Sequence, residues 1–431
     1  MAKGSVRKKG KKWYYRFYVE DASGNRIQKE YPGTESKSET EKLLRAAMED
    51  YENKRFIAKT DNITLGGMLD EWVEQGLKTG PFSNGTVEHY QFITDKIKQH
   101  PISKRKLKTV TPDHLQAFFD LLAFGGTCED FVSKGYVPGS LHSFSSVLNH
   151  AFRFAVFPKQ YITFNPMQYI VLRKKQDQSD LFLSKNADGS DIRTLSTEMY
   201  NALLDYLKER NPAAVLPVQI SYYTGLRMGE VCGLSWDDIH LDEQYLSVRR
   251  SSRYRPKRRK TEISTTKSKK VRIVDFCDTL KLILKKARRE QAKQRLKYGV
   301  LYHRNYYREV VEKNRVHYEL EHFDGTTEIP EGYKEIPLVC IRPDGSFESY
   351  DALSTACKMA GKRVPGLEGF HFHMLRHTYT SNLLAQGAHP KEVQELLGHE
   401  DVSTTMNIYA HASREAKKQS AKLLDNLAVG M

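Results

Sequence analysis

The chain has 431 residues, which exceeds one ordinary domain and predicts two or three domains. Its 68 Lys and Arg residues outnumber its 53 Asp and Glu residues, and the formal net charge of +15 favours a polyanionic partner. Nucleic acid is the first such partner, although an anionic membrane surface would satisfy the same charge. The sequence has no apolar run as long as a membrane-spanning helix, and its basic amino terminus lacks the apolar core of a signal peptide. We therefore expect neither a membrane-spanning protein nor a secreted one.

The five cysteines are scattered along the chain and form no CxxC pair. Such a set is typical of small buried residues in a reducing cytosol, and it fits neither a disulfide framework nor a thiolate zinc site. These residues are Cys128, Cys232, Cys277, Cys340 and Cys357.

The amino-terminal stretch predicts a small sheet followed by a helix. Aromatic and polar residues alternate from Lys11 to Glu20, turn residues follow at 23–25, and the chain returns as NRIQKEYPG. Helical spacing then runs from Ser38 to Lys54. About fifty residues form only a marginal core, so we expect this part to work while docked on a partner. A generic basic β-hairpin appendage is the alternative.

Residues 64–173 predict a small helical bundle. Four segments, separated by Gly or Pro, carry apolar residues at three- and four-residue spacing, and Lys and Arg gather in the connections. A bundle whose charges only face solvent would show the same pattern. From Arg173 to Asp191 the periodicity is lost and polar residues increase, which predicts an interdomain linker.

The second half of the chain mixes predicted helices with short strands. Ser196 caps a helix that reaches about Glu209, and a helix at 213–223 ends at Gly225, shortly before Arg227. Two strands follow, YLSVRR and KKVRIVDF. The densely basic connection between them predicts either contact with phosphates or a solvated loop.

Two further segments have no chemistry that the sequence assigns. Residues 281–299 predict a long basic helix, and the Tyr-rich segment that follows, up to residue 350, predicts irregular structure. At the carboxyl end, residues 413–430 predict an amphipathic helix that packs either on its own chain or on a neighbouring subunit.

The stretch from Gly369 to His411 gathers the candidate reactive groups. Its first helix, which Gly387 ends, places His373, Arg376 and His377 at i, i+3 and i+4. Three cationic or protonatable groups therefore share one ridge of a helix.

Two more elements follow in the same stretch. A helix begins at Pro390 and ends at Gly398, which leaves His399 just past its carboxyl end. A further helical run begins at Ser403 and carries Tyr409. A histidine and a tyrosine thus come shortly after the ridge in the chain.

Four sequence boxes in this half resemble those of the tyrosine recombinases, the phage integrase family. HMLRH and LLGHEDVSTTMNIYAH resemble its carboxyl-terminal signature, YYTGLRMGEVCGLSWDDI resembles its first arginine box, and Lys267 in TTKSKKVRIVD resembles its hairpin lysine. The boxes occur in the family's order. The chain resembles integrases of conjugative transposons and of phages of Gram-positive bacteria. His399 and Tyr409 are separated by one residue more than is common in the family, and this spacing resembles that of the conjugative-transposon integrases.

The resemblance implies a multidomain fold that is mainly α with small β-sheets. We expect a three-stranded sheet plus helix as an arm-type DNA-binding domain, a helical core-binding domain, and a mixed α+β catalytic domain with a tail helix. The expected bounds are 1–58 for the arm domain, 62–174 for the core-binding domain, 175–192 for a linker and 193–431 for the catalytic domain.

A phosphodiester resists attack because both the nucleophile and the transition state are negative, so the site must supply fixed positive charge and donors. The resemblance assigns this task to Arg227 and Arg376, whose planar forks can hold phosphate oxygens without a metal. It assigns a further hydrogen bond to the same phosphate to His399.

The resemblance makes Tyr409 the nucleophile, which would form an O-(3′-phospho-DNA)-tyrosine intermediate. Because the ordinary pKa of tyrosine is about 10, its proton needs an acceptor, and His373 is assigned that role. Lys267 would protonate the departing 5′ oxygen, since burial near arginines lowers the pKa of a lysine. We expect Glu230 to brace the pocket and His377 to be structural.

The phosphotyrosyl bond would keep the energy of the broken linkage, so the resemblance implies strand exchange through a Holliday junction without ATP, a metal or another cofactor. The expected partners are double-stranded DNA at core-type and arm-type attachment sites, a homotetramer on that DNA, and an excisionase and a host DNA-bending protein as accessory factors, with no membrane. The expected place is the bacterial cytoplasm, at the nucleoid, in the integration and excision of a phage or a conjugative transposon.

Three other interpretations stay open at this point. A zinc site at His371, His373, His377 and His399 has no cysteine or carboxylate that completes a usual ligand set. A type IB topoisomerase would use the same chemistry to relax supercoils, although the arm-like domain argues against it. A non-catalytic DNA-binding regulator needs only the basic bundle and leaves the ordered boxes unexplained.

Overall fold

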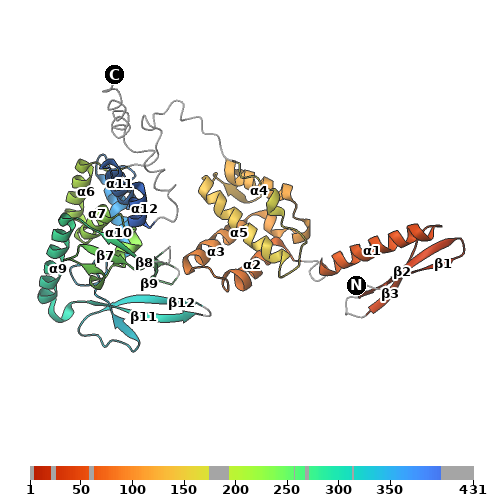
Figure 1. Cartoon of the computed structure of the whole chain (residues 1–431), viewed down its shortest axis with the longest axis horizontal. Coiled ribbons are helices and arrows are strands. Elements are labelled where there is room, and N and C mark those ends of the chain that lie inside the picture. The colour runs from red at the N-terminus through yellow and green to blue at the C-terminus, as the bar shows by residue number, and fades with distance from the viewer. Residues whose placement is uncertain are drawn as a thin grey trace, which may run out of the picture. The chain divides into compact units, whose positions relative to one another are not determined.

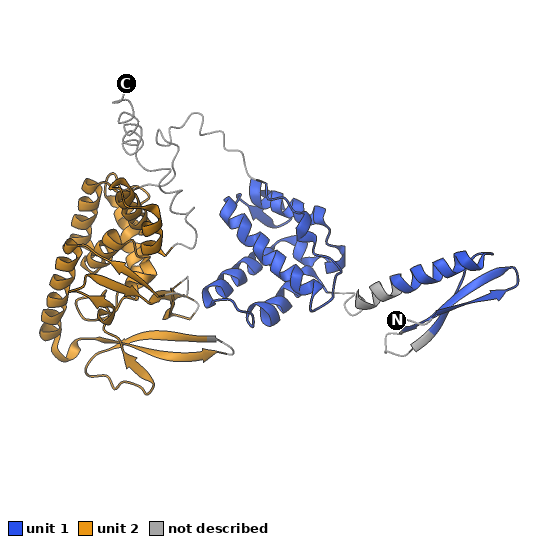
Figure 2. Cartoon of the chain, in the orientation of Figure 1, with its two compact units in different colours: residues 1–177 blue, residues 178–431 orange. Residues whose placement is uncertain are grey.

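The computed structural model describes residues 4–20, 26–57, 63–173, 194–256, 258–266, 271–312 and 315–398. The chain divides into two compact units, residues 1–177 and residues 178–431 (Figure 2). The division falls inside the predicted linker at 175–192. Each unit contains its own buried core.

The amino-terminal part of the first unit is a three-stranded antiparallel sheet with one helix packed on it (Figure 1). Because side chains alternate along a strand, Phe17 and Val19 of the central strand share one face, and both are buried with Leu44 of the helix. The predicted sheet and helix are confirmed. The elements are β1 (Gly4–Lys9), β2 (Lys12–Glu20), β3 (Arg26–Pro32) and α1 (Lys37–Ile57).

The rest of the first unit is the predicted helical bundle. Thr64, Ser83 and Thr111 each accept a hydrogen bond from the first turn of a helix and so fix where three of its helices begin. Phe118 and Phe144 are fully buried in its core. The helices are α2 (Leu65–Trp72), continued by a π-helical turn (Val73–Leu77), α3 (Asn84–Gln99), α4 (Pro112–Phe124) and α5 (Pro138–Val156). A small hairpin that the sequence did not predict, β4 (Gly126–Cys128) and β5 (Phe131–Ser133), joins α4 to α5.

The second unit is an α+β domain whose helices enclose one large core. Leu203, Val218 and Leu375 come from three different helices and have no exposed surface. Ser196 caps the first helix and Gly225 ends the second, as predicted. The helices are α6 (Thr197–Arg210), α7 (Val215–Thr224), α8 (Met228–Cys232), α9 (Asp278–Tyr298), α10 (Tyr350–Arg363), α11 (His373–Ala385) and α12 (Pro390–Leu397).

Two antiparallel sheets complete this unit. The first has the order β10-β7-β6, so the two predicted strands pair directly, with Leu246 opposite Val274. The second has the order β13-β11-β12-β9-β8. The strands are β6 (Ile239–His240), β7 (Tyr245–Val248), β8 (Arg250–Arg255), β9 (Lys260–Thr265), β10 (Arg272–Asp275), β11 (Arg304–Glu312), β12 (Arg315–Phe323) and β13 (Tyr333–Glu335).

In the second sheet, two segments that were expected to lack regular structure form hairpins, while contact of the basic connection with phosphates stays a prediction. The basic connection after β7 forms the β8–β9 hairpin, and the Tyr-rich segment after α9 forms the β11–β12 hairpin, which pairs with β9. The charges in these segments pair across strands. Arg308 donates to Glu319 at 2.7 Å and Lys260 pairs with Glu321, so residues that resemble a solvated loop in the sequence stabilise strand pairs instead.

Gly225 allows a close approach between the end of α7 and two other helices. Its φ of +65° lies in the left-handed region, and a Cβ there would lie 2.6 Å from Cδ1 of Tyr379 and 2.8 Å from Cδ2 of Leu397. We expect Gly225→Ala to lower the free energy of unfolding by about 2–5 kcal/mol, because backbone strain and overpacking add. Chemical denaturation of the full chain measures the loss.

Gly366→Ala is the matched control for this substitution. The φ of Gly366 is +85°, but no atom of the described chain lies within 4 Å of a Cβ placed there. This variant should lose only the strain contribution, about 1–2 kcal/mol. Equal losses in the two variants would contradict the packing argument.

Candidate active site

Arg376 on α11 is buried, with 1% of its surface exposed. Its Nη1 donates to the carbonyl oxygen of Gly225 at 2.8 Å, and its Nη2 donates to that of Leu397 at 2.7 Å. These carbonyls lie at the carboxyl ends of α7 and α12, where helix carbonyls lack partners within the helix and carry partial negative charge. One guanidinium group therefore joins the ends of two helices.

Arg227 and Arg272 share the carboxylate of Glu230. Arg227 precedes α8, and its backbone N–H donates to Oε2 at 2.9 Å while its Nη1 donates to Oε1 at 3.0 Å. Arg272 begins β10 and donates from Nη1 to Oε1 at 3.0 Å and from Nη2 to Oε2 at 2.7 Å. Four donors thus converge on a carboxylate that is 2% exposed, and they fill its acceptor capacity.

The three arginines, Arg227, Arg272 and Arg376, outnumber the one carboxylate among them, so this arginine cluster has a net positive charge. Burial alone would raise the pKa of Glu230, but hydrogen bonds and charge from Arg272 and Arg227 outweigh it and lower that pKa to about 2. Burial, with the charge of Arg227, lowers the pKa of Arg376 to about 9. Three guanidinium groups around one ionised carboxylate make a strong site for an anion.

His373 and His377 lie one turn apart on α11, with ring centroids 4.8 Å apart and planes at 89°. Desolvation of the ring, with the charges of His377 and Arg376, lowers the pKa of His373 to about 4, although the residue remains accessible to solvent. His373 is therefore neutral at neutral pH and can accept a proton. Nδ1 of His377 is buried and has no hydrogen-bond partner among the described residues.

The described structure contains five of the predicted site residues in one region of the second unit. Arg227 lowers the pKa of both His373 and Arg376, which places the three side chains within electrostatic reach. The five residues are Arg227, Glu230, His373, Arg376 and His377. The other three, Lys267, His399 and Tyr409, lie outside the described residues.

Sequence reasoning missed Arg272, although its strand was predicted. No usable signal lies in this stretch, because the apolar residues Val271 and Ile273 indicate the other face of the strand as the buried one, whereas both are more than half exposed and Val274 is buried. An arginine on the buried face of a strand requires a carboxylate partner. Glu230 is that partner.

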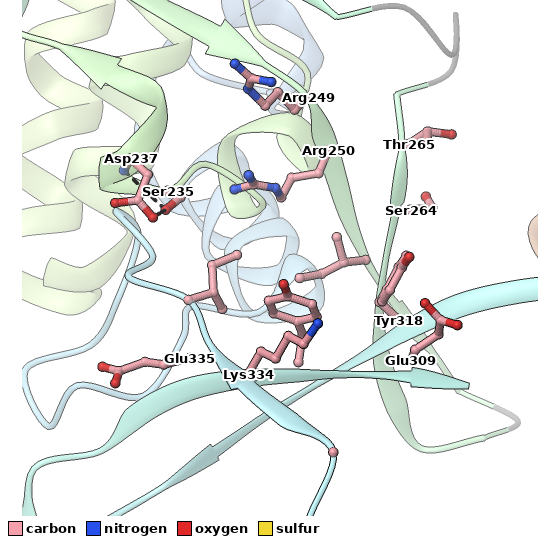
Figure 3. Close-up of a pocket in the computed structure, with 14 residues that line it drawn as sticks. Ser235, Asp237, Arg249, Arg250, Ser264, Thr265, Glu309, Tyr318, Lys334 and Glu335 are labelled. Carbon is pink, nitrogen blue, oxygen red and sulfur yellow. Dashed lines mark hydrogen bonds between the residues drawn. The ribbon is translucent and has the colours of Figure 1, made fainter. Parts of the chain in front are cut away.

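A separate pocket of about 450 Å³ lies against the second sheet (Figure 3). Arg249 and Arg250 border it near Ser235, and Tyr318 borders it from β12. Arg250 donates to the buried carboxylate of Asp238 at 2.8 Å. None of the predicted site residues lines this pocket, so it is distinct from the arginine cluster.

The described residues contain neither a candidate metal site nor a membrane-spanning helix. No group of three or more His, Cys, Asp or Glu side chains in that part of the chain could hold a metal ion. No helix within the same ranges is long and apolar enough to cross a membrane.

Fixed guanidinium groups beside a neutral histidine, in an α+β domain, suit the binding of an anion such as a phosphate group. Residues 193–416, more than half of the chain, match the phage integrase family. The chain therefore belongs to the phage integrase family. It is a tyrosine recombinase, an enzyme that cleaves and rejoins DNA strands at specific sites.

Known relatives agree with this assignment. The chain is 25% identical over 446 aligned residues to a tyrosine recombinase XerC-like protein of Caldanaerobacter subterraneus subsp. tengcongensis, and the match covers 100% of both chains. The solved integrase of transposon Tn1549 in complex with transposon right end DNA has a TM-score of 0.58 and 16% identity, covering 84% of this chain and 99% of that one. A lambda integrase tetramer bound to a Holliday junction has a TM-score of 0.51 and 17% identity, covering 90% and 93%. These structures share the fold, and the expected mainly α fold with small sheets is confirmed.

The shared carboxylate makes the second unit sensitive to acid. A group whose pKa is lowered on folding stabilises the fold above its ordinary pKa, here 4.5, and loses that contribution as the pH falls toward the folded value of about 2. The shift of Glu230 corresponds to about 3 kcal/mol. We expect the difference in free energy of unfolding between wild type and Glu230→Gln to be largest at neutral pH and to shrink between pH 4.5 and pH 2. Urea unfolding across that range tests this, and a constant difference would contradict it.

Proposed function

We propose that Tyr409 attacks a DNA phosphodiester held between Arg227 and Arg376 and forms a 3′-phosphotyrosyl intermediate. The observation that carries the proposal is the convergence of these two arginines, far apart in sequence, on one region of excess positive charge. Arg376 uses two of its N–H groups on helix carbonyls in the described chain. A guanidinium has five such groups, so capacity is left for phosphate oxygens.

His373 takes the proton of the Tyr409 hydroxyl in this proposal. Its pKa is lowered to about 4 in the free protein, so the imidazole is neutral and able to accept. A bound phosphate would raise that pKa, since a nearby anion favours the charged imidazolium. DNA binding would thereby make the proton transfer more favourable.

The other site residues act on the leaving group, on the phosphate or on the side chains that hold it. Lys267 protonates the departing 5′ oxygen, and His399 donates a further hydrogen bond to a phosphate oxygen. Glu230 braces Arg227, and His377 packs beside His373. The phosphotyrosyl linkage keeps the energy of the broken bond, so a free 5′ hydroxyl can reverse the step without ATP or a metal.

We further propose that strand exchange occurs in a homotetramer through a Holliday junction and serves the integration and excision of a mobile element. The tetrameric lambda integrase on a Holliday junction supports this by its shared fold. The reaction would take place in the bacterial cytoplasm at the nucleoid, with an excisionase and a host DNA-bending protein as accessory factors. The relatives are recombinases and integrases, and they give no support to the topoisomerase or regulator interpretations.

Tyr409→Phe tests the chemistry directly. A nicked suicide substrate releases a short 5′-hydroxyl strand after cleavage, so the wild type should accumulate a denaturant-resistant protein–DNA adduct, also with chelator present. Tyr409→Phe should form none, because the nucleophilic oxygen is missing. Tyr298→Phe, at the end of α9, is the control and should form the adduct normally. An adduct with Tyr409→Phe would refute the nucleophile, and its absence with the wild type would refute the enzyme mechanism.

We propose that residues 1–58 bind arm-type DNA sites and residues 62–174 bind core-type sites, ahead of a linker at 175–192 and the catalytic domain at 193–431. The sheet in the first of these parts supports an arm function. On its face opposite α1, Arg16 lies across from Ser5 and Glu30, and Arg7 lies across from Tyr14. Glu30 pairs with Arg7 at 2.5 Å and also with Lys9. One carboxylate among these cations leaves a positive face suited to a duplex.

Removal of one cation from that face should weaken arm-site binding. We expect Arg16→Ala to lower the affinity of the full chain for a duplex selected by the wild type from random DNA, and to reduce the salt slope by about one ion. Arg45→Ala removes the same charge from an exposed position on α1 and is the control. Fluorescence anisotropy over a salt series separates the two, and equal effects would contradict a role for the sheet face.

A further inference from the structure

Arg272 connects three elements of the second unit through one side chain. Its Nη1 and Nη2 donate to the two oxygens of Glu230 at 3.0 and 2.7 Å, and its Nε donates to the carbonyl oxygen of Leu396 at 3.2 Å. Only 10% of the side-chain surface is exposed. Because each end of the guanidinium is fixed, movement of the Arg272 side chain would displace both partners.

The first partner positions Arg227. Glu230 accepts the backbone N–H of Arg227 at 2.9 Å and its Nη1 at 3.0 Å with the same two oxygens that hold Arg272. Without Arg272, the charge of this carboxylate would act on Arg227 alone and neutralise it. With Arg272 present, one negative charge is shared by two guanidinium groups, and Arg227 keeps charge to offer to a phosphate.

The second partner is the end of α12. Leu396 lies in its last turn, and a Cβ on Gly398 would lie 2.9 Å from Cδ of Arg272, so the side chain packs directly on the backbone there. Gly398 has a φ of +64°, which also favours glycine. Arg376 holds the adjacent carbonyl of Leu397. In the chain, His399 follows this doubly held turn directly.

We propose that Arg272 is a positioning residue for strand cleavage, which orients Arg227 through Glu230 and fixes the end of α12 that precedes His399 through the carbonyl of Leu396. The inference rests on the proposed function, in which Arg227 and His399 contact the scissile phosphate. Arg272 itself does not touch the DNA in this arrangement. Its effect should therefore be on the rate of cleavage and not on the affinity for DNA.

Single-turnover adduct formation on the suicide substrate, together with Kd from anisotropy, tests this. Arg272→Met should slow cleavage by about 100-fold, as a small displacement of reacting groups does, while Kd stays unchanged. Arg272→Lys keeps the positive charge but cannot make all three hydrogen bonds. Its cleavage rate should therefore lie between the rate of the wild type and that of Arg272→Met. Combining Arg272→Met with Glu230→Gln should recover part of the rate, because the carboxylate that would neutralise Arg227 is gone.

Arg250→Met is the matched control. It also removes a guanidinium from a buried carboxylate of the same unit, Asp238, which pairs with Arg249 and Arg250 and not with the arginines of the cluster, and it should cleave at the wild-type rate. All cleavage assays are run at a temperature below the thermal unfolding midpoint of each variant, so that every variant is folded. The inference is overturned if Arg272→Met cleaves as fast as Arg250→Met, if its loss is in Kd, or if the double variant is no faster than Arg272→Met. Failure of the wild type to form an adduct would instead refute the proposed function.

Discussion

One buried carboxylate allows several guanidinium groups to occupy a small region of this protein. Two like charges 4 Å apart repel by about 4 kcal/mol at the effective dielectric of a protein surface, so an arginine cluster without a counter-charge would disperse. Glu230 prevents this by accepting four hydrogen bonds from two arginines. Its capacity is then full, and the charge of Arg376 is not neutralised. The cluster remains stable while it stays positive overall.

The second unit assembles this site at the ends of its elements. Arg227 stands before α8, Arg272 begins β10, and Arg376 bonds the carbonyls that end α7 and α12. Ends of helices are where backbone groups lack partners, so they both need and orient charged side chains. The glycines that end α7 and α12 therefore matter twice. They stop the helices, and they leave room for neighbouring side chains, which are Tyr379 and Leu397 at Gly225 and Arg272 at Gly398.

Much of the fold was predictable from the sequence because its signals are local. Apolar spacing and capping residues placed the bundle helices and α6, α7, α11 and α12 close to their observed bounds. The ordered boxes point to Arg227, Glu230 and Arg376, which the structure brings into one region. The β8–β9 and β11–β12 hairpins were not predicted, since Arg308 and Glu319 signal a pair only once the strands are aligned. Arg272 was missed for the same reason. Its partner lies on another element, and the alternation of Val271 and Ile273 indicates the opposite face of the strand as the buried one, although both residues are exposed.

The balance of charge also bears on how the proposed reaction is accelerated. A phosphodiester carries one negative charge, and attack by a phenolate oxygen adds a second in the transition state. Three guanidinium groups around one carboxylate leave two net positive charges, which match the transition state better than the bound substrate. Interactions that strengthen along the reaction lower its barrier, whereas those that bind both states equally do not. With Arg227 and Arg376 alone beside Glu230, the guanidinium cluster would carry one net positive charge. In the proposed reaction, the third guanidinium, Arg272, therefore adds to the positive field that favours the transition state, beside its role in positioning Arg227.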